Sequence, residues 1–249
     1  MRFNWLKPAN GHATAVSLLA EIYASSLMAI ACVFAVLLGL SNQLGEAAPA
    51  NCEAAQCVNL VFDGDSISAG AGASPGNALD RQVAKAVGPD VRLHNVAVGG
   101  RPVVDCLALY DQLVAPLFDA SSRRNVIAFH AGDNDIAQGR SAEETYAAFT
   151  DYVAAAHRQG WKVVVSTELR HADFSVLLET KLENYNTLLM RNRAGADAVV
   201  DLDADPKLRE FSYRKKPELF SSDGIHPSDG GYALLAAMLA PQVKRVAGL

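Results

Sequence analysis

Residues 58–66 read VNLVFDGDS, a mostly apolar run that ends at a glycine and is followed by an aspartate and a serine. Such a run, closed by glycine, predicts a short buried strand over residues 58–62. Outward from it, the chain alternates similar apolar runs with segments whose apolar residues recur at helical spacing. The further predicted strands are residues 91–96, 125–129, 161–165 and 198–202, and the predicted helices are residues 78–87, 103–118 (broken or kinked at Pro116), 142–157, 176–193 and 232–246.

The predicted strands are apolar throughout rather than alternately, which is typical of a parallel sheet covered by helices on both faces. We therefore predict one three-layer α/β/α domain with a five-stranded parallel sheet of flavodoxin-like order. Ligands of such sheets bind beyond the carboxyl ends of the strands. Ser66, Gly100 and Asn134 follow the first three predicted strands. Asp223 and His226 lie in a long loop after the fifth, so all five residues are expected at one edge of the sheet.

A serine, a histidine and an aspartate at that edge suit nucleophilic acyl transfer. Serine alone is a poor nucleophile, so it needs a base to take its proton and a carboxylate to orient that base. Ser66 is the candidate nucleophile, His226 the candidate general base and Asp223 the orienting group. The glycine-flanked nucleophile elbow of α/β-hydrolases does not match, because Ser68 stands where its final glycine would be.

Four segments carry a family resemblance: GDS at 64–66, NVAVGG at 95–100, GDND at 132–135 and DGIHP at 223–227. In this order they resemble the four blocks of the SGNH (GDSL-type) hydrolases, whose block residues would be Ser66, Gly100, Asn134 and His226. The resemblance runs from about residue 58 to the end of the chain. It implies a serine esterase that hydrolyses acyl or acetyl esters of a lipid, glycan or small molecule through an acyl-enzyme, with no cofactor and no metal.

The resemblance also implies an oxyanion hole. Its donors would be the backbone N–H of Ser66, Gly100 and the side-chain amide of Asn134, with Gly99 as a neighbouring candidate. Fixed donors of this kind stabilise the negative charge that develops on a carbonyl oxygen during acyl transfer.

Two sites depart from the family pattern. Asp63 stands where a small or apolar residue is more usual, and Arg101 and Pro102 follow Gly100 where small or acidic residues are common. Arg101 either attracts an acidic group of the substrate or pairs with Asp105. Neither departure removes a catalytic group.

Other functions stay open at this point. The same triad could transfer an acyl group to a sugar or lipid hydroxyl, because exclusion of water decides between transfer and hydrolysis. The domain could also be a non-catalytic module that binds envelope glycans. Residues 62–66 further resemble the Asp-x-Asp start of haloacid-dehalogenase-type phosphatases, with residues 132–135 as a source of magnesium ligands. That interpretation leaves Asp223 and His226 unexplained and lacks a convincing lysine block.

Two features near the predicted site have no assigned role. His130 and His171 lie close to the active edge, and we expect structural or solvated roles for both. Residues 203–222 are rich in basic and aromatic side chains. This segment forms either a wall of the substrate pocket or a solvated loop.

An appendage precedes the domain. Residues 22–40 are apolar or small and carry no charge, which is long enough to span a bilayer. Arg2 and Lys7 precede this run and Glu46 and Glu53 follow it, so the positive-inside rule places the N-terminus in the cytoplasm and the domain outside. Because Ala-Pro-Ala at 48–50 suits signal cleavage, residues 1–50 are either a membrane anchor or a long signal peptide. Residues 51–249 then form a periplasmic, membrane-tethered or secreted hydrolase domain.

Composition narrows the partners. The net charge of −5 and pI near 5.7 give no basic face for nucleic acid, so we expect a small-molecule, lipid or glycan ester as substrate. An oxidising compartment would permit a disulfide between Cys52 and Cys57, which are close in sequence, and Cys106 is a further thiol. The cysteine spacing does not match a zinc site.

Overall fold

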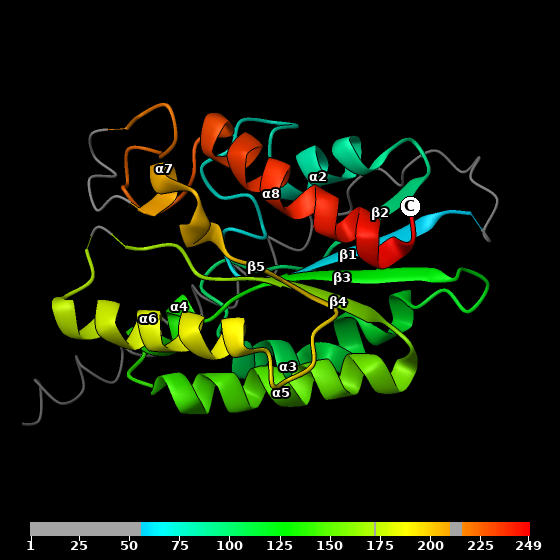
Figure 1. Ribbon diagram of the computed structural model, residues 1–249, viewed down its shortest axis with the longest axis horizontal. Helices are drawn as coiled ribbons and strands as arrows, with labels where there is room; N and C mark the ends of the chain where they lie inside the picture. Colours follow the sequence, from blue (N-terminus) through cyan, green and yellow to red (C-terminus); the bar gives the residue numbers. More distant parts are fainter. Residues whose placement is uncertain (1–55, 172, 210–215) are drawn as a thin grey trace, which may run out of the picture. The chain divides into compact units, whose positions relative to one another are not determined.

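The computed structural model describes residues 56–171, 173–209 and 216–249. Its centre is a five-stranded sheet in the order β2-β1-β3-β4-β5, and every neighbouring pair of strands is parallel (Figure 1). The strands are β1 (Val58–Gly64), β2 (Val91–Asn95), β3 (Arg124–His130), β4 (Lys162–Ser166) and β5 (Ala198–Val200). The predicted fold class and flavodoxin-like strand order are therefore confirmed.

Helices cover both faces of the sheet (Figure 1). One face carries α2 (Leu79–Val87) and α8 (Asp229–Ala247), and the other carries α3 (Val103–Leu113), α5 (Ala142–Gln159) and α6 (Val176–Arg191). Successive side chains of a strand point to opposite faces. Leu60 and Phe62 of β1 accordingly pack in the apolar cluster with α8, whereas Val61 packs in the cluster with α5. Burial on both faces explains why the strands are apolar throughout.

The long helices begin and end at residues that satisfy their terminal backbone groups. The Ser141 hydroxyl accepts the N–H of Glu144 while the Glu144 carboxylate accepts the N–H of Ser141, which is a capping box at the start of α5. Helix α5 ends at Gly160, whose φ of 103° lies in the left-handed region that glycine adopts readily. The hydroxyls of Ser175 and Ser228 accept the N–H groups of Leu178 and Gly231 and so cap the starts of α6 and α8.

Some boundaries differ from the sequence prediction. The helix expected over residues 103–118 ends at Leu113, and a 3₁₀ turn, η1 (Ala115–Leu117), contains Pro116. Proline lacks an N–H and its ring clashes with the preceding turn, so the helix cannot run through it. Three short elements were not predicted, since three to five residues show no periodicity: α4 (Asp133–Ala137), η2 (Leu202–Ala204) and α7 (Pro206–Arg209).

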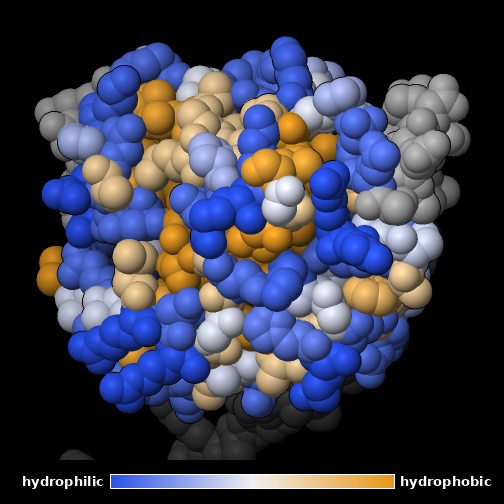
Figure 2. Space-filling model, turned by 45° about the vertical axis from the view of Figure 1, so that its right-hand side comes forward, coloured by the Kyte–Doolittle hydropathy of each residue, from blue (hydrophilic) through white to orange (hydrophobic). Residues whose placement is uncertain are grey.

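The surface of the unit is mixed in polarity. On the face drawn in Figure 2, hydrophilic side chains surround smaller hydrophobic patches.

No helix within the described residues combines the length and the apolar composition that crossing a membrane requires. The anchor or signal peptide expected over residues 1–50 lies outside the described residues. Cys57 is disulfide-bonded and Cys106 is a buried free thiol, whereas Cys52, the expected partner of Cys57, is not among the described residues.

Candidate active site

Three side chains that are far apart in sequence form a hydrogen-bonded chain at the carboxyl edge of the sheet. His226 Nε2 lies 2.9 Å from Ser66 Oγ, and His226 Nδ1 lies 2.7 Å from Asp223 Oδ2. Ser66 and Asp223 thus contact opposite nitrogens of one imidazole. This is the arrangement in which a histidine takes a proton from a serine while a carboxylate holds the ring in position.

The turn after β1 presents Ser66 to solvent. Gly64 has a φ of 136°, and a β-carbon at this position would lie 1.9 Å from the carbonyl oxygen of His130, so only glycine fits. Asp65 then turns the chain: its N–H donates to the His130 carbonyl oxygen at 3.1 Å, and its Oδ1 accepts the N–H of Ile67 at 2.9 Å. These contacts leave Ser66 partly exposed at the end of a buried strand.

The loop before α8 fixes the other two members. Asp223 Oδ1 accepts hydrogen bonds from the Ser221 hydroxyl at 2.6 Å and from the N–H groups of Ile225 and His226 at 2.9 and 3.0 Å. Burial would raise the pKa of Asp223, but the hydrogen bonds from Ser221 and His226 outweigh it and hold the pKa well below its usual range. Asp223 is therefore ionised, as an orienting group must be.

Gly99, Gly100 and Asn134 line the same cleft as Ser66 and His226, and the cleft has a volume of about 430 Å³. Gly100 has a φ of 77°, although a β-carbon there would meet nothing within 4 Å, so backbone conformation rather than space requires the glycine. A β-carbon on Gly99 would lie 3.6 Å from the β-carbon of Ser66, which places this turn beside the nucleophile. The five predicted site residues are thus brought together, and their roles in catalysis stay predictions.

The two departures from the family pattern explain each other. Arg101 forms a buried ion pair with Asp63, not with Asp105 as one of the two expectations had it. The Arg101 guanidinium also donates to the Val96 carbonyl oxygen at 3.0 Å, and the Tyr152 hydroxyl donates to Asp63 Oδ2 at 2.6 Å. The side chain of Arg101 is 5% exposed, so it is not placed to attract an acidic group of the substrate.

A buried polar cluster, two of whose members line the cleft, was not predicted. We define it as Asp65, His130, Asp133, Glu168 and His171, all of which are buried. His130 lies between the Ser166 hydroxyl at 2.8 Å and Glu168 Oε2 at 3.2 Å, and His171 Nε2 lies 3.0 Å from Asp133 Oδ2. Neither histidine is solvated. The only sequence signal for the cluster is position, because each member follows or ends a strand at the active edge.

The buried polar cluster does not carry a full negative charge. Burial raises the pKa of Asp65 and of Glu168 well above the ordinary values, and the charge of Asp133 adds to both effects. Burial would also raise the pKa of Asp133, but the hydrogen bond and charge of His171 lower it. The pKa of Asp65 is raised while that of Asp133 is lowered, so Asp65 is the more readily protonated of these two carboxyls.

Three members of the cluster could hold a metal ion, as judged by spacing within the described residues. Ligand atoms of Asp65, His130 and Glu168 all lie within 4.8 Å of one another. Glu168 Oε2 lies 3.2 Å from His130 Nε2, and burial raises the pKa values of Asp65 and Glu168. That no metal takes part in the reaction stays a prediction.

The match to known families and structures agrees with the fold. Residues 62–234 match the GDSL-like lipase/acylhydrolase family, and the chain belongs to it; the protein is therefore an ester-hydrolysing enzyme. An acetylxylan esterase from Geobacillus stearothermophilus has a similar fold, with a TM-score of 0.56 and 17% identity over 79% of this chain and 96% of the esterase. An α/β hydrolase enzyme from the metagenome of Lake Arreo, Spain, superposes with a TM-score of 0.57 and 19% identity, covering 79% of this chain and 97% of that enzyme. Among curated proteins, none is detectably similar in sequence.

Proposed function

We propose that this protein hydrolyses carboxylic esters, namely acyl or acetyl esters of a lipid, glycan or small molecule, by a Ser66–His226–Asp223 triad through an acyl-enzyme. The observation that carries the proposal is the unbroken chain of contacts from Ser66 Oγ through both nitrogens of His226 to Asp223. A serine hydroxyl aimed at an imidazole whose other nitrogen faces an ionised carboxylate has the geometry of an activated nucleophile.

The first half of the reaction forms the acyl-enzyme. Ser66 Oγ attacks the carbonyl carbon of the ester while His226 Nε2 takes the hydroxyl proton, and Asp223 stabilises the imidazolium that results. The negative charge on the former carbonyl oxygen is stabilised by donors of the oxyanion hole, for which Gly100 and Asn134 are placed in the cleft. The bond to the leaving alcohol then breaks, and the alcohol takes the proton from His226.

The second half returns the enzyme. Water enters, gives a proton to His226 and attacks the acyl carbon; the bond to Ser66 Oγ breaks and the serine regains its proton. An acceptor hydroxyl in place of water would make the protein an acyltransferase by the same steps. Ala137, Phe174 and Ile225 line the cleft beside these groups and would contact the acyl or alcohol part of the substrate.

The similar structures suggest a first substrate to test. The similar acetylxylan esterase acts on an acetylated glycan, which makes an acetylated sugar a suitable first substrate to test here. A p-nitrophenyl ester panel of increasing chain length, run with the full-length protein beside an acetylated glycan, separates short from long acyl groups. Addition of an alcohol or sugar acceptor distinguishes transfer from hydrolysis by the new ester it yields.

The decisive variant is Ser66→Ala. It should abolish turnover of every ester that the wild type cleaves, and His226→Ala should do nearly the same, because members of a triad act as a unit. Ser121→Ala is the matched control, since Ser121 is exposed and precedes β3 at the opposite edge of the sheet. Full activity in Ser66→Ala would overturn the proposal, as would hydrolysis that Ser66→Ala and Ser121→Ala reduce equally.

We propose further that the catalytic domain works outside the cytoplasm. The apolar run at 22–40 with basic residues before it supports this, and so does the disulfide at Cys57, because disulfides persist in oxidising compartments. An alkaline phosphatase reporter fused after Leu249 should be active. A reporter fused at the same position that is active only in the cytoplasm would contradict export. N-terminal sequencing of the mature protein then separates an anchor from a cleaved signal.

A further inference from the structure

Asp133 links the oxyanion hole to a histidine that the triad does not use. Asp133 Oδ1 accepts hydrogen bonds from the backbone and the side chain of Asn134, the latter at 2.6 Å. Asp133 Oδ2 lies 3.0 Å from His171 Nε2. One carboxylate thus joins His171 to the amide that would donate to the oxyanion, and all three residues line the cleft with Ser66.

We propose that Asp133 and His171 are positioning residues for the oxyanion hole: Asp133 orients the Asn134 amide, and the His171 imidazolium cancels the charge of Asp133 toward the oxyanion. This inference rests on the proposed esterase mechanism and adds a second charged pair to it. The pair is separate from His226 and Asp223, which act on the proton of Ser66.

The need for a counter-charge follows from the position of Asp133. The side-chain amide hydrogen of Asn134 that bonds to Asp133 holds the side chain in one orientation and leaves the other amide hydrogen for the substrate. A carboxylate this close to the oxyanion hole would also repel the negative charge that forms there, and the repulsion is strong where water is excluded. A cation on the other carboxylate oxygen removes most of that repulsion while it leaves the hydrogen bonds to Asn134 intact.

The surroundings of His171 favour its charged form. Its ring faces Asp133 from α4 and Asp173 in its own loop, whose Oδ1 lies 3.8 Å from His171 Nδ1. Glu168 after β4 also acts on its charge, and Glu179 of α6 accepts the His171 N–H at 2.8 Å. Behind Asp133 lie Asp65 and His130 of the buried polar cluster, which act on Asp133 rather than on His171 directly.

The balance of these groups raises the pKa of His171. Burial opposes the charged form, but the hydrogen bond and charge of Asp133, followed by the charges of Glu168 and Asp173, outweigh it. The ring of Phe174 stacks on that of His171 with centroids 4.2 Å apart and an interplanar angle of 23°, which holds the imidazole in the wall of the cleft. His171 therefore stays protonated to a higher pH than an ordinary histidine.

A distinct pH dependence follows. When His171 loses its proton at high pH, Asp133 is left with an uncompensated charge beside the oxyanion hole, and kcat should fall. The wild type should therefore show a descending alkaline limb in kcat. A purely structural role for His171 would lower the amount of folded enzyme without changing the shape of this profile.

Two variants and their combination test the charge relation. His171→Gln keeps a donor that can reach Asp133 but lacks the charge, so kcat at pH 7 should fall roughly tenfold, less than the roughly 10²–10³-fold loss of an oxyanion donor, with little change in KM and no alkaline limb. Asp133→Asn removes the charge that needs compensation and should also lack the limb. In His171→Gln the added Asp133→Asn should recover most of the lost kcat, because no charge is left to compensate.

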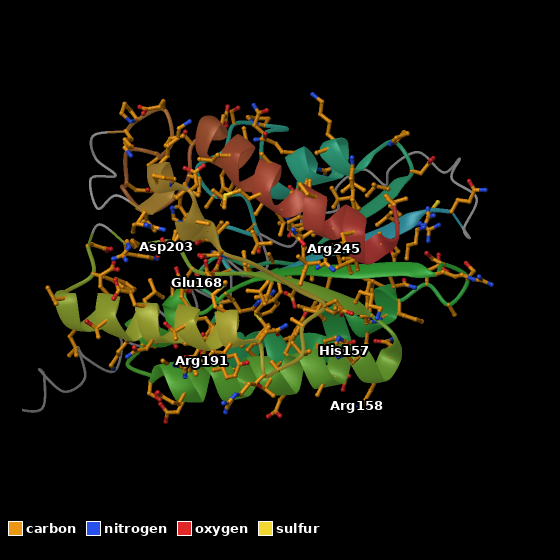
Figure 3. All side chains as sticks on the ribbon, in the orientation of Figure 1. His157, Arg158, Glu168, Arg191, Asp203 and Arg245 are labelled. Atoms are coloured by element: carbon orange, nitrogen blue, oxygen red, sulfur yellow. The ribbon has the colours of Figure 1, made fainter. Side chains whose placement is uncertain are left out.

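A matched control is His157→Gln. His157 pairs with Asp197 at 2.9 Å but sits at the opposite end of the sheet from Glu168 (Figure 3), so its kcat profile should match the wild type. A wild-type profile without an alkaline limb would overturn the inference, and this measurement needs no variant. A limb retained in His171→Gln, or no recovery in the combined variant, would overturn it too. If the wild type shows no Ser66-dependent hydrolysis at all, the proposed function itself has failed and the inference falls with it.

Discussion

Removal of Arg101 should destabilise the domain strongly because it leaves a buried carboxylate without its cation. Arg101 and Asp63 are 5% and 2% exposed in their side chains, and Arg101 also donates to Val96. Breaking a buried pair by deletion of one partner costs about 3–5 kcal/mol. For a domain of roughly this size each kcal/mol lowers Tm by about 2–4 °C, so Arg101→Met should lower Tm by about 6–20 °C.

The loss should depend on pH with a definite sign. Burial already raises the pKa of Asp63 above its ordinary value, although Arg101, Tyr152 and Gly64 act to lower it. Without Arg101 that pKa rises further. When the pKa of a carboxyl is higher in the folded than in the unfolded protein, the group favours folding most at pH values below its unfolded pKa. That contribution is lost as pH rises toward the folded pKa. The Tm deficit of Arg101→Met should therefore be smaller at about pH 4.5, close to the unfolded pKa of about 3.9, than at neutral pH.

A second substitution and a surface control sharpen the test. Asp63→Asn in the Arg101→Met background should restore about 1–3 kcal/mol, because the amide needs no counter-charge and its oxygen still accepts the Tyr152 hydroxyl. Arg92→Met removes an exposed arginine from its pair with Asp119 and should cost about 1 kcal/mol or less. Thermal unfolding followed by circular dichroism measures all four proteins. An Arg101→Met Tm close to that of Arg92→Met, or a deficit that Asp63→Asn leaves unchanged, would refute this reasoning.

Three further outcomes are expected. Asn134→Ala should lower kcat for p-nitrophenyl esters by about 10²–10³, with Tm near the wild-type value, and a smaller loss would remove Asn134 from the oxyanion hole. Dialysis against EDTA should leave the rate of ester hydrolysis unchanged, because the triad needs no Lewis acid; a rate restored only by added metal would contradict this. The Ser121 hydroxyl, with Arg92, lowers the pKa of Asp119 to about 2, so Asp119 adds stability at neutral pH that is lost as pH falls from its unfolded value toward about 2. Asp119→Asn should therefore lower the urea midpoint of unfolding at pH near 7 and change it less at about pH 2.5. An equal shift at both pH values would contradict this role of Asp119.

The fold could be predicted because its strands are buried on both faces. Leu60 and Phe62 pack with α8 while Val61 packs with α5, so apolar residues are favoured on both faces of β1 and the run stands out in the sequence. The end of helix α3 was harder to place. Pro116 signals a break, but the chain leaves the helix earlier, at Leu113, and the preceding residues carry no stop signal of their own.

The candidate site likewise contains residues that the sequence could predict and residues that it could not. Ser66, Asp223 and His226 stand in short motifs, and local contacts such as Asp223 with the Ile225 N–H hold them, so sequence alone suffices to nominate them. Arg101 could be identified as unusual, but its partner could not be predicted, because Asp63 lies far away in the sequence on β1 while Asp105 is close by. Contacts between segments far apart in the chain leave no periodic signal, which is why the buried polar cluster escaped prediction.

The ion pairs at the two edges of the sheet differ in burial. Ion pairs at the amino edge of the sheet, such as that of His157 with Asp197, are partly exposed and water screens them. The pair of His171 with Asp133 at the carboxyl edge is buried, and there the same separation produces a much stronger interaction. Burial of charged groups opposes folding, so their concentration beside Ser66 is not explained by stability. It is explained if the groups act on charge that forms during the reaction, which is the role that the alkaline limb of kcat tests.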